Sequence, residues 1–391
     1  MCKHAHPSRR DFFTRFTQNV LLGSSILQIA AHRAAWAQAL APGASPDLFD
    51  IQKVAEDVYF ALARPSPVIN CNAAIFVNSA DVLVVDAHSK PSAAAALISQ
   101  IKRDVTPKPV RYLVDSHFHW DHSQGNAAYL ATGNKVDILA TNTTKQLMEQ
   151  YNAARLKASL DPAGPSPISY PWVGHQMEDV RDRIGKATSE AEKARIQSQL
   201  QRLESFAAEM KNFTPTLPTI TFDKSYVVKD KNHELHLEFH GHAHTAGDVV
   251  VFCPQKRVIA TGDAILGSVL PFFGDSYPKA WPKTIVDIGK LEFDHVMPGH
   301  GGVQHGHETL SGMGDYIDEI AGRVDTGKKA GQSIADLQKA IAFDSLKSLQ
   351  SGAYADSLGS WAAGNKALRM GYVQNGIKTN ILEMYDKVER V

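Results

Sequence analysis

The residues from His117 to His122, HFHWDH, bring three histidines and one aspartate together within six positions. They closely follow an apolar run, VRYLV, that is typical of a β-strand. In extended backbone alternate side chains share a face, so His117, His119 and Asp121 point the same way. Zinc and similar metals bind imidazole nitrogens and carboxylate oxygens, and a catalytic site keeps one position open for water. The motif predicts a metal site, and its four donors can serve two ions.

Three further donor side chains follow other apolar runs. His244 comes after ELHLEFH, Asp263 after KRVIA, and His300 after DHVMP, and each is flanked by glycine or by a turn. The ends of neighbouring strands can converge on one edge of a sheet assembly. We therefore expect these three residues to join the first four in a single site.

The elements that must position these residues are predicted from periodicity. The runs AAIFV, DVLVVDA, VRYLVDS and VDILAT are expected to be strands, with a helix, SAAAALISQIKRD, between the second and the third. Strands resume with PTITF, SYVVK, ELHLEFH, DVVVFC, KRVIATG and FDHVMPG. The pattern predicts an α/β fold.

Two segments depart from this alternation. Residues 143–211 contain few strand signals, and the stretch EDVRDRIGKATSEAEKARIQSQLQRLESFAAEMK is predicted to be one long helix whose charges face solvent. The tail from about His307 to Val391 is mostly helical in pattern. We expect a helical insertion at 143–211 and a helical C-terminal extension at 305–391.

Composition limits the classes of partner. The chain has 391 residues, 43% of them hydrophobic, which is enough for a large buried core. Its 41 basic residues balance 41 acidic ones, so nothing indicates a nucleic-acid partner or a broadly basic membrane-binding face. The expected partner is a small-molecule substrate, and the C-terminal helices can mediate oligomerisation.

The first 39 residues have the order of an export signal. SRRDFFTRF precedes the apolar run VLLGSSILQIAA and the small-residue cleavage pattern AWAQA. Arg9 and Arg10, followed by Phe12 and Phe13, are similar to a twin-arginine signal, which exports folded proteins. The apolar run is too short to anchor the chain in a membrane. We expect cleavage after Ala39 and a location in the bacterial periplasm.

Two of the three cysteines remain after such a cleavage. Cys71 and Cys253 both lie in apolar, strand-like contexts. They are either two buried thiols or one disulfide, since an exported protein meets an oxidising compartment. Neither has a metal-ligand spacing.

The motifs HFHWDH, HTAGD, TGD and PGHG, in this order, resemble the metallo-β-lactamase superfamily of αββα hydrolases. The resemblance spans roughly Val54 to Gly302, within a domain expected at 48–304. It implies a four-layer αββα sandwich. It also implies one metal held by His117, His119 and His244 and a second held by Asp121, His122 and His300, with Asp263 bridging both.

The resemblance also implies a hydrolytic mechanism. Two zinc ions per chain, with iron or manganese as alternatives, would share a bridging water and lower its pKa to about 7, giving a hydroxide nucleophile. Asp121 is expected to be a ligand first and a proton carrier second. Several metallo-β-lactamases have cysteine or serine where this chain has Asp263, and an aspartate there resembles the glyoxalase II, lactonase and phosphodiesterase branches. The bond cleaved is expected to be an ester, lactone, lactam or related bond.

Two other functions stay open on the sequence. One is a mononuclear iron enzyme resembling the sulfur dioxygenases of the same superfamily. The other is a metal-holding interaction protein without turnover. A structural zinc site is normally closed by four ligands, whereas seven candidates favour chemistry.

Several residues near the motifs are assigned outer or structural roles. Asp86 is expected to order the site from behind the ligands, and Asp248 to orient a histidine or cap a turn. The HTAGD context favours His244 over His242, and the sequence leaves open whether His88 faces the pocket. His233, His236 and His240 are expected at exposed strand positions, and His295, His305 and His307 at the surface. Candidate cleft residues are Trp120, Tyr170, Trp172, Phe272, Phe273 and Tyr277.

Overall fold

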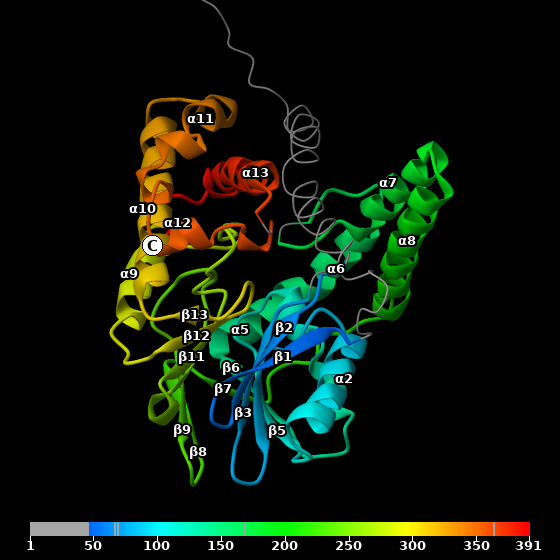
Figure 1. Ribbon diagram of the computed structural model, residues 1–391, viewed down its shortest axis with the longest axis vertical. Helices are drawn as coiled ribbons and strands as arrows, with labels where there is room; N and C mark the ends of the chain where they lie inside the picture. Colours follow the sequence, from blue (N-terminus) through cyan, green and yellow to red (C-terminus); the bar gives the residue numbers. More distant parts are fainter. Residues whose placement is uncertain (1–46, 66–67, 69, 168, 363) are drawn as a thin grey trace, which may run out of the picture.

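Two β-sheets pack face to face, with helices outside both of them (Figure 1). The computed structural model describes residues 47–391 apart from 66–67, 69, 168 and 363. The predicted export signal, residues 1–39, lies outside the described residues. The two sheets and their outer helices confirm the four-layer αββα arrangement expected from the sequence.

The first sheet has seven strands in sequential order, from β1 to β7. Its first four strands pair antiparallel, and the pairs from β4 to β7 are parallel. The strands are β1 (Phe49–Ala55), β2 (Val58–Ala63), β3 (Ala73–Val77), β4 (Val82–Val85), β5 (Val110–Val114), β6 (Asp137–Thr141) and β7 (Ile220–Phe222).

The second sheet has six strands in the order β13-β12-β11-β10-β9-β8. All of its pairs are antiparallel except the parallel pair of β11 and β12. The strands are β8 (Ser225–Lys229), β9 (Glu234–Glu238), β10 (Val250–Cys253), β11 (Val258–Gly262), β12 (His295–Pro298) and β13 (Gln304–His305).

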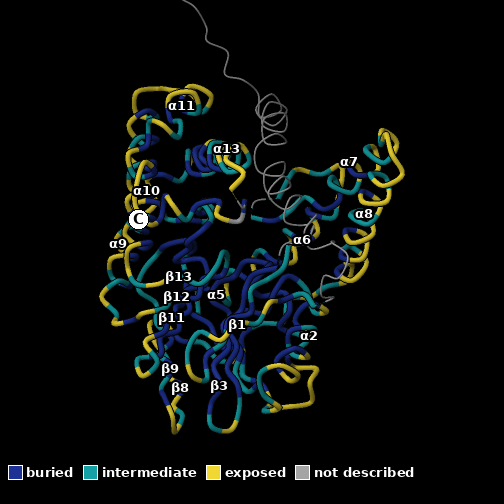
Figure 2. Tube along the Cα trace, in the orientation of Figure 1, coloured by how far each residue is buried: buried dark blue, intermediate teal, exposed yellow. Residues whose placement is uncertain are grey.

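The alternation of side chains explains the layers. In β3, Ala74 and Phe76 pack between the sheets against residues such as Leu237, whereas Ile75 faces the other way, towards Leu97 in the helical layer. All five residues of β3 are buried, because both faces of the sheet are covered. Figure 2 shows that the strands are largely buried and that exposed residues gather on the outer helices.

Helices cover the outer face of each sheet. The first sheet is covered by α2 (Pro91–Gln100), which continues into the π-helical turn η1 (Ile101–Val105). Two short helices, α3 (Trp120–Ser123) and α4 (Asn126–Leu130), follow β5. The second sheet is covered by α9 (Trp281–Ile288) and the C-terminal helices, whose apolar residues join those of β10, β11 and β12 in one core.

The predicted insertion is helical and lies between β6 and β7. It consists of α5 (Asn142–Leu147), the π-helical turn η2 (Met148–Asn152), α6 (Ala153–Leu160), α7 (Val173–Lys186) and α8 (Glu190–Met210). Its own apolar core includes Trp120 and Tyr170, whose ring centroids lie 4.8 Å apart. Trp120 therefore packs against the insertion.

The prediction of one long helix in this segment is wrong. The chain leaves helical geometry at Ala187, and α8 begins after Ser189, whose side chain accepts a hydrogen bond from the backbone N–H of Glu192. A serine in extended geometry at an N-cap satisfies an otherwise unpaired donor. The two helices then pack against each other as a hairpin.

The C-terminal tail is also helical, as predicted. It consists of α10 (Glu308–Lys329), α11 (Ile334–Ala340), α12 (Ala353–Ser357) and α13 (Lys366–Met384). Three 3₁₀ turns lie between these helices: η4 (Phe343–Ser345), η5 (Lys347–Leu349) and η6 (Ser360–Ala362). A further 3₁₀ turn, η3 (Pro254–Lys256), lies outside the tail and joins β10 to β11. Among the described residues, no helix has the length and apolar character needed to cross a bilayer. Dimerisation through these helices stays a prediction.

The disulfide considered from the sequence is not formed. Cys71 and Cys253 are both buried and both free. Cys253 packs between the two sheets. The two thiols are therefore part of the interior.

Replacing the cap of α8 tests why the helix is interrupted. Ser189→Ala should lower the free energy of unfolding by about 1 kcal/mol, because the N–H of Glu192 loses its acceptor. Ser198→Ala, inside the same helix, is the matched control and should be neutral or slightly stabilising, since alanine is the best helix former. Urea unfolding followed by far-UV circular dichroism measures both. Equal effects of the two substitutions would contradict the capping role.

Candidate metal centre

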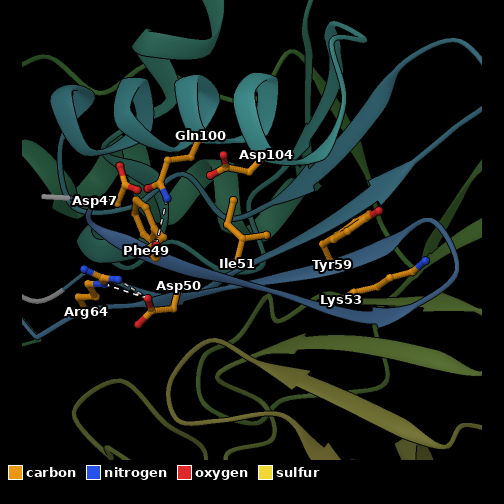
Figure 3. A pocket seen from close by; sticks show the side chains of 9 residues that line it. All are labelled: Asp47, Phe49, Asp50, Ile51, Lys53, Tyr59, Arg64, Gln100 and Asp104. Atoms are coloured by element: carbon orange, nitrogen blue, oxygen red, sulfur yellow. Dashed lines mark hydrogen bonds and ion pairs between the residues drawn. The ribbon is translucent and has the colours of Figure 1, made fainter. Parts of the chain in front are cut away.

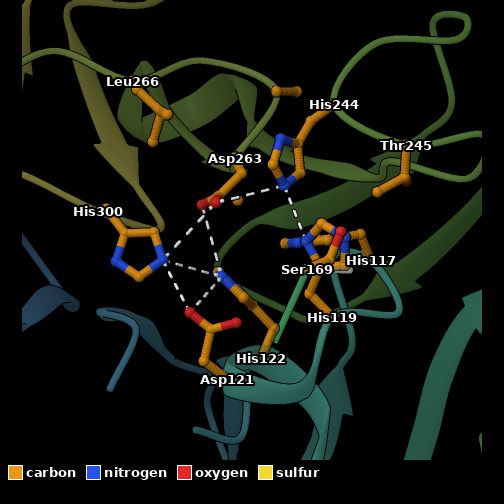
Figure 4. Close-up of polar contacts among 12 residues, drawn as sticks. His117, His119, Asp121, His122, Ser169, His244, Thr245, Asp263, Leu266 and His300 are labelled. Carbon is orange, nitrogen blue, oxygen red and sulfur yellow. Dashed lines mark hydrogen bonds and ion pairs between the residues drawn. The ribbon is translucent and has the colours of Figure 1, made fainter. Parts of the chain in front are cut away.

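The seven predicted ligands meet at one edge of the sandwich, although they come from four separate segments (Figure 4). The segment after β5 supplies four of them, two before α3 and two within it. The loop after β9, the residue after β11 and the turn after β12 supply one each. The seven residues are His117, His119, Asp121, His122, His244, Asp263 and His300.

One group consists of three buried histidines. The possible ligand atoms of His117, His119 and His244 lie within 4.8 Å of one another. Nε2 of His244 is 2.9 Å from Nδ1 of His119. Burial holds the pKa of His117 and that of His244 well below the ordinary value, so these imidazoles are neutral and have a lone pair to offer.

A second group lies beside the first. It consists of Asp121, His122 and His300. Nε2 of His300 is 3.0 Å from Oδ2 of Asp121 and 3.3 Å from Nε2 of His122. The side chain of His300 is more exposed than that of His122, so this group is open to solvent at His300.

The carboxylate of Asp263 lies between the two groups. Its Oδ2 is 3.6 Å from Nε2 of His244 and 3.6 Å from Nε2 of His300. Its Oδ1 is 3.5 Å from Nε2 of His122. One carboxylate thus faces histidines of both groups, which is the arrangement that a ligand shared by two ions requires.

The donor set fits divalent cations. Nε2 of His117 and Oδ1 of Asp263 are buried atoms without a hydrogen-bond partner. Such atoms are costly unless something pairs with them. The neighbouring donors are themselves imidazole nitrogens and carboxylate oxygens, which would bind the same cation. Ions at the two groups would satisfy these atoms.

Asp86 lies behind the ligands, as expected. Its two oxygens accept hydrogen bonds from the backbone N–H of Ser116, at 2.8 Å, and from the Ser116 hydroxyl, at 3.0 Å. Oδ2 also lies 2.8 Å from Nδ1 of His122, which leaves Nε2 of that ring facing the site. Asp86 adopts a φ of 73°, in the left-handed region that aspartate tolerates better than most residues.

Gly299, in the turn before His300, lies too close to the predicted ligands to be replaced by a residue with a side chain. A Cβ on Gly299 would lie 2.3 Å from Oδ1 of Asp263. Any side chain there would displace the carboxylate between the two groups. The same turn is anchored by Asn72, whose amide donates to the carbonyls of Pro298, at 3.1 Å, and Gly301, at 2.7 Å.

Asp248 has the second of its two expected roles. It accepts from the backbone N–H and the hydroxyl of Thr245, at 2.7 and 2.8 Å. It therefore stabilises the turn after His244 by capping it. His242 lies outside the cluster, where its Nδ1 contacts the carbonyl of Val391 and its ring packs near Tyr277.

Other histidines have structural positions. The expectation that His233 is exposed is wrong: it is buried, and its Nε2 lies 2.9 Å from Oδ1 of Asn78. His88 is fully buried, with Nδ1 3.1 Å from the carbonyl of Cys71, and it belongs to none of the possible ligand groups among the described residues. His295 sits opposite His305 on paired strands. His236 and His240 are half-buried and pair with glutamates.

The sequence missed Cys71, Asp275 and Arg155. The Cys71 thiol is close to Asp86 and His122, but burial raises its pKa to about 12, so it stays protonated. Asp275 contacts His119, a predicted ligand, and is held by Arg155 from α6. In the sequence, the only indication of a role for Asp275 is that it is an acidic residue in the loop after Asp263. No sequence pattern indicates a role for Arg155.

The aromatic residues proposed to line a cleft separate in the structure. Phe272 lies near the histidines, with its ring centroid 6.1 Å from that of His119 and 6.2 Å from that of His244. Phe273 is instead buried against Trp281, at 5.6 Å. The hydroxyl of Tyr170 donates to Gln124 inside the insertion core. Of the others in that set, Trp172 stacks on His175, and Tyr277 packs against His242 with its ring tilted by 38°.

A hollow of about 370 Å³ lies elsewhere, between the β1–β2 hairpin and the end of α2 (Figure 3). None of the predicted metal ligands lines it. Its lining residues are Asp47, Phe49, Asp50, Ile51, Lys53, Tyr59, Arg64, Gln100 and Asp104. Their charges are mixed, and the hollow is separate from the metal centre.

The loop after Asp263 is fastened to the C-terminal helix α13. The backbone N–H of Leu270 donates to the hydroxyl of Tyr372, at 2.9 Å, and that of Phe273 donates to the carboxylate of Glu383, at 3.0 Å. Burial raises the pKa of Glu383 to about 8. The charge of Lys387 lowers the pKa of this carboxyl and that of Asp275 raises it, but both effects are smaller than that of burial.

The comparison with protein families agrees with the geometry. Residues 66–300 match the metallo-beta-lactamase superfamily, which is more than half of the chain. The chain therefore belongs to the metallo-beta-lactamase superfamily. Among solved structures, it is similar to a metallo-beta-lactamase from Pontibacter korlensis, with 17% sequence identity and a TM-score of 0.48, over 69% of this chain and 99% of that one.

The buried carboxyl of Glu383 predicts a pH dependence of stability. Its pKa is about 8 in the folded chain, above the ordinary 4.5. Its contribution to the free energy of unfolding is therefore fully present below pH 4.5 and is lost as the pH rises through 8. Glutamine does not ionise, so Glu383→Gln should gain stability relative to the wild type across this interval.

Urea unfolding at several pH values between about 5 and 9 measures the difference. Glu389→Gln, on the exposed end of the same segment, is the control and should follow the wild type. Parallel curves for Glu383→Gln and the wild type would contradict the prediction.

Proposed function

We propose that this chain is a metal-dependent hydrolase that cleaves an ester, lactone, lactam or related bond with two zinc ions. The observation that supports it most is the position of Asp263, whose carboxylate faces histidines of two adjacent three-residue groups. Sites with two ions about 3.5–4 Å apart are typical of hydrolases. Membership of the superfamily supports the same class of reaction.

The residues have separate tasks in this proposal. His117, His119 and His244 would hold the first ion, and Asp121, His122 and His300 the second, with Asp263 shared. Ions bound there would lower the pKa of a water to about 7 and polarise the carbonyl or phosphoryl oxygen of a substrate. Asp121 is also positioned to pass a proton, because its Oδ2 lies 3.0 Å from the partly exposed His300.

Several side chains keep water from reaching the first ion freely. His117 and His244 are almost completely buried, while His300 has 18% of its side chain exposed. A substrate would therefore approach from the side of His300. Phe272 lies near His119 and His244, with ring centroids 6.1 and 6.2 Å away, and would contact an apolar part of a substrate bound beside them.

We further propose that the protein acts in the bacterial periplasm. The order of twin arginines, apolar run and small-residue cleavage pattern in residues 1–39 supports export. Sequencing of the N-terminus of protein recovered from the periplasm would test this. A chain that still begins at Met1, recovered only from the cytoplasm, would contradict it.

The first test of the hydrolase proposal is metal analysis of the purified chain and two variants. The wild type should contain about two zinc ions. Asp263→Ala should lose ions from both groups, because it removes the shared ligand, and His117→Ala should lose one. One iron per chain would contradict the hydrolase and indicate an oxygen-dependent enzyme, and no bound metal would contradict both.

The second test is hydrolysis of a panel of β-lactams, lactones, carboxylic esters and phosphodiesters. His244→Ala should lose more than about 100-fold of the best activity, because removing even an outer partner of a ligand costs 10- to 100-fold. His242→Ala is the matched control, since it lies two residues away and contacts Val391 instead of the site. Equal losses in the two variants would contradict the ligand assignment.

A further inference from the structure

Asp275 contacts the metal centre from outside the two groups. Its Oδ2 lies 2.9 Å from Nε2 of His119, and 85% of its side chain is shielded from solvent. Nδ1 of the same histidine faces His244, at 2.9 Å. The two nitrogens of His119 thus have different partners, with the carboxylate on the outer side and the ligand group on the inner side.

Asp275 is itself held by the helical insertion. The guanidinium of Arg155, in α6, donates from Nη1 to Oδ2 at 2.7 Å and from Nη2 to Oδ1 at 2.9 Å. The hydroxyl of Ser169 also donates to Oδ2. Arg155 lies over the ring of Tyr151, at 4.5 Å, which further limits the positions of its side chain.

We propose that Asp275 is a positioning residue for the ligand His119, and that Arg155 of the insertion fixes Asp275 for this role. The proposal rests on the metal centre described under the proposed function. It makes the insertion part of the site, although none of the seven predicted ligands lies within it.

The physical reason is the choice of tautomer. A neutral imidazole has one N–H and one lone pair, and the partner of one nitrogen decides which nitrogen can bind a metal. Asp275 can only accept, so Nε2 of His119 carries the proton and Nδ1 offers its lone pair to the site. Rotation of the ring would break this contact, so Asp275 also fixes its orientation.

Two other ligand rings, those of His122 and His117, have outer partners from the sandwich itself. Nδ1 of His122 faces Asp86, and Nδ1 of His117 faces the hydroxyl of Ser116, at 3.0 Å. Asp86 directly follows β4, and Ser116 lies two residues after the end of β5. His119 depends instead on a loop after β11 and on a helix between β6 and β7.

The bidentate contact between Arg155 and Asp275 is well suited to holding Asp275 in place against His119. Two parallel hydrogen bonds between a guanidinium and a carboxylate fix the plane of the carboxylate as well as its place. Both partners are largely buried, so each would be costly to leave alone. The alternative is that Arg155 and Asp275 only fasten the insertion to the sandwich, without effect on His119.

Zinc affinity and the visible spectrum of cobalt separate these alternatives. The purified chain is stripped of metal and titrated with zinc against a chelator, and a parallel sample is loaded with cobalt. Asp275→Ala should bind one of the two zinc ions about 10- to 100-fold more weakly, as is usual when a ligand loses its outer partner. The cobalt absorption bands should change because the ligand ring is no longer held.

The double variant Arg155→Gln with Asp275→Ala distinguishes positioning from simple charge repulsion. Asp275→Ala leaves the buried cation of Arg155 unpaired near the site, which by itself would weaken metal binding. The double variant removes that cation and still lacks the acceptor for His119. We expect it to remain about as weak as Asp275→Ala, and recovery of wild-type affinity would overturn the proposal.

The single variants Arg155→Gln and Arg155→Lys test the second half of the proposal. Both lose the bidentate contact, so both should bind the same ion more weakly, with a smaller loss for lysine, which keeps the charge. They also serve if Asp275→Ala does not fold, as judged by circular dichroism. Arg181→Gln is the matched control, because Arg181 pairs with Glu204 within the insertion, at 2.7 Å, away from the site.

Unchanged zinc affinity and cobalt spectrum in the Asp275 and Arg155 variants would overturn the proposal. So would an equal loss in Arg181→Gln, which would show a general loosening of the insertion. A wild type that binds two ions but hydrolyses nothing would contradict the proposed function and leave this test intact. A wild type that binds no metal would overturn both.

Discussion

The carboxylate of Asp263 lies in the interior, within 3.6 Å of ring nitrogens from His122, His244 and His300. A buried charge is costly unless it is paired, and a buried imidazole nitrogen without a partner is costly as well. Divalent ions bound between these groups would satisfy the carboxylate and the unpaired nitrogen of His117 together. The geometry of the two sheets matters because it brings these donors to the same place.

The sandwich achieves this by ending its strands at a common edge. β5 and β11 belong to different sheets, and the core of apolar side chains between them fixes their separation. Donor residues that follow closely after these strands are therefore held in fixed positions. The close approach at Gly299 and the hydrogen bonds of Asp86 then set the positions of Asp263 and His122 in detail.

The segment after Asp263 joins the centre to both helical additions of the chain. The insertion holds it through Arg155 and Ser169 at Asp275, and the C-terminal helix α13 holds it through Tyr372 and Glu383. Loops at the ends of a rigid scaffold commonly determine which substrate is accepted. Here the loop that includes Phe272 is fastened on two sides, so the additions to the fold would influence substrate choice through it.

The sequence by itself determined the class of fold and the set of donor residues. A short apolar run such as AAIFV is typical of a buried strand, and HFHWDH two residues after VRYLV places donors at a strand end, because both patterns depend only on neighbouring residues. Tertiary structure decided the contact of Arg155 with Asp275, 120 positions apart, and the burial of His233 against Asn78. Such contacts depend on how loops and helices pack after the chain has folded, and no local pattern contains that information.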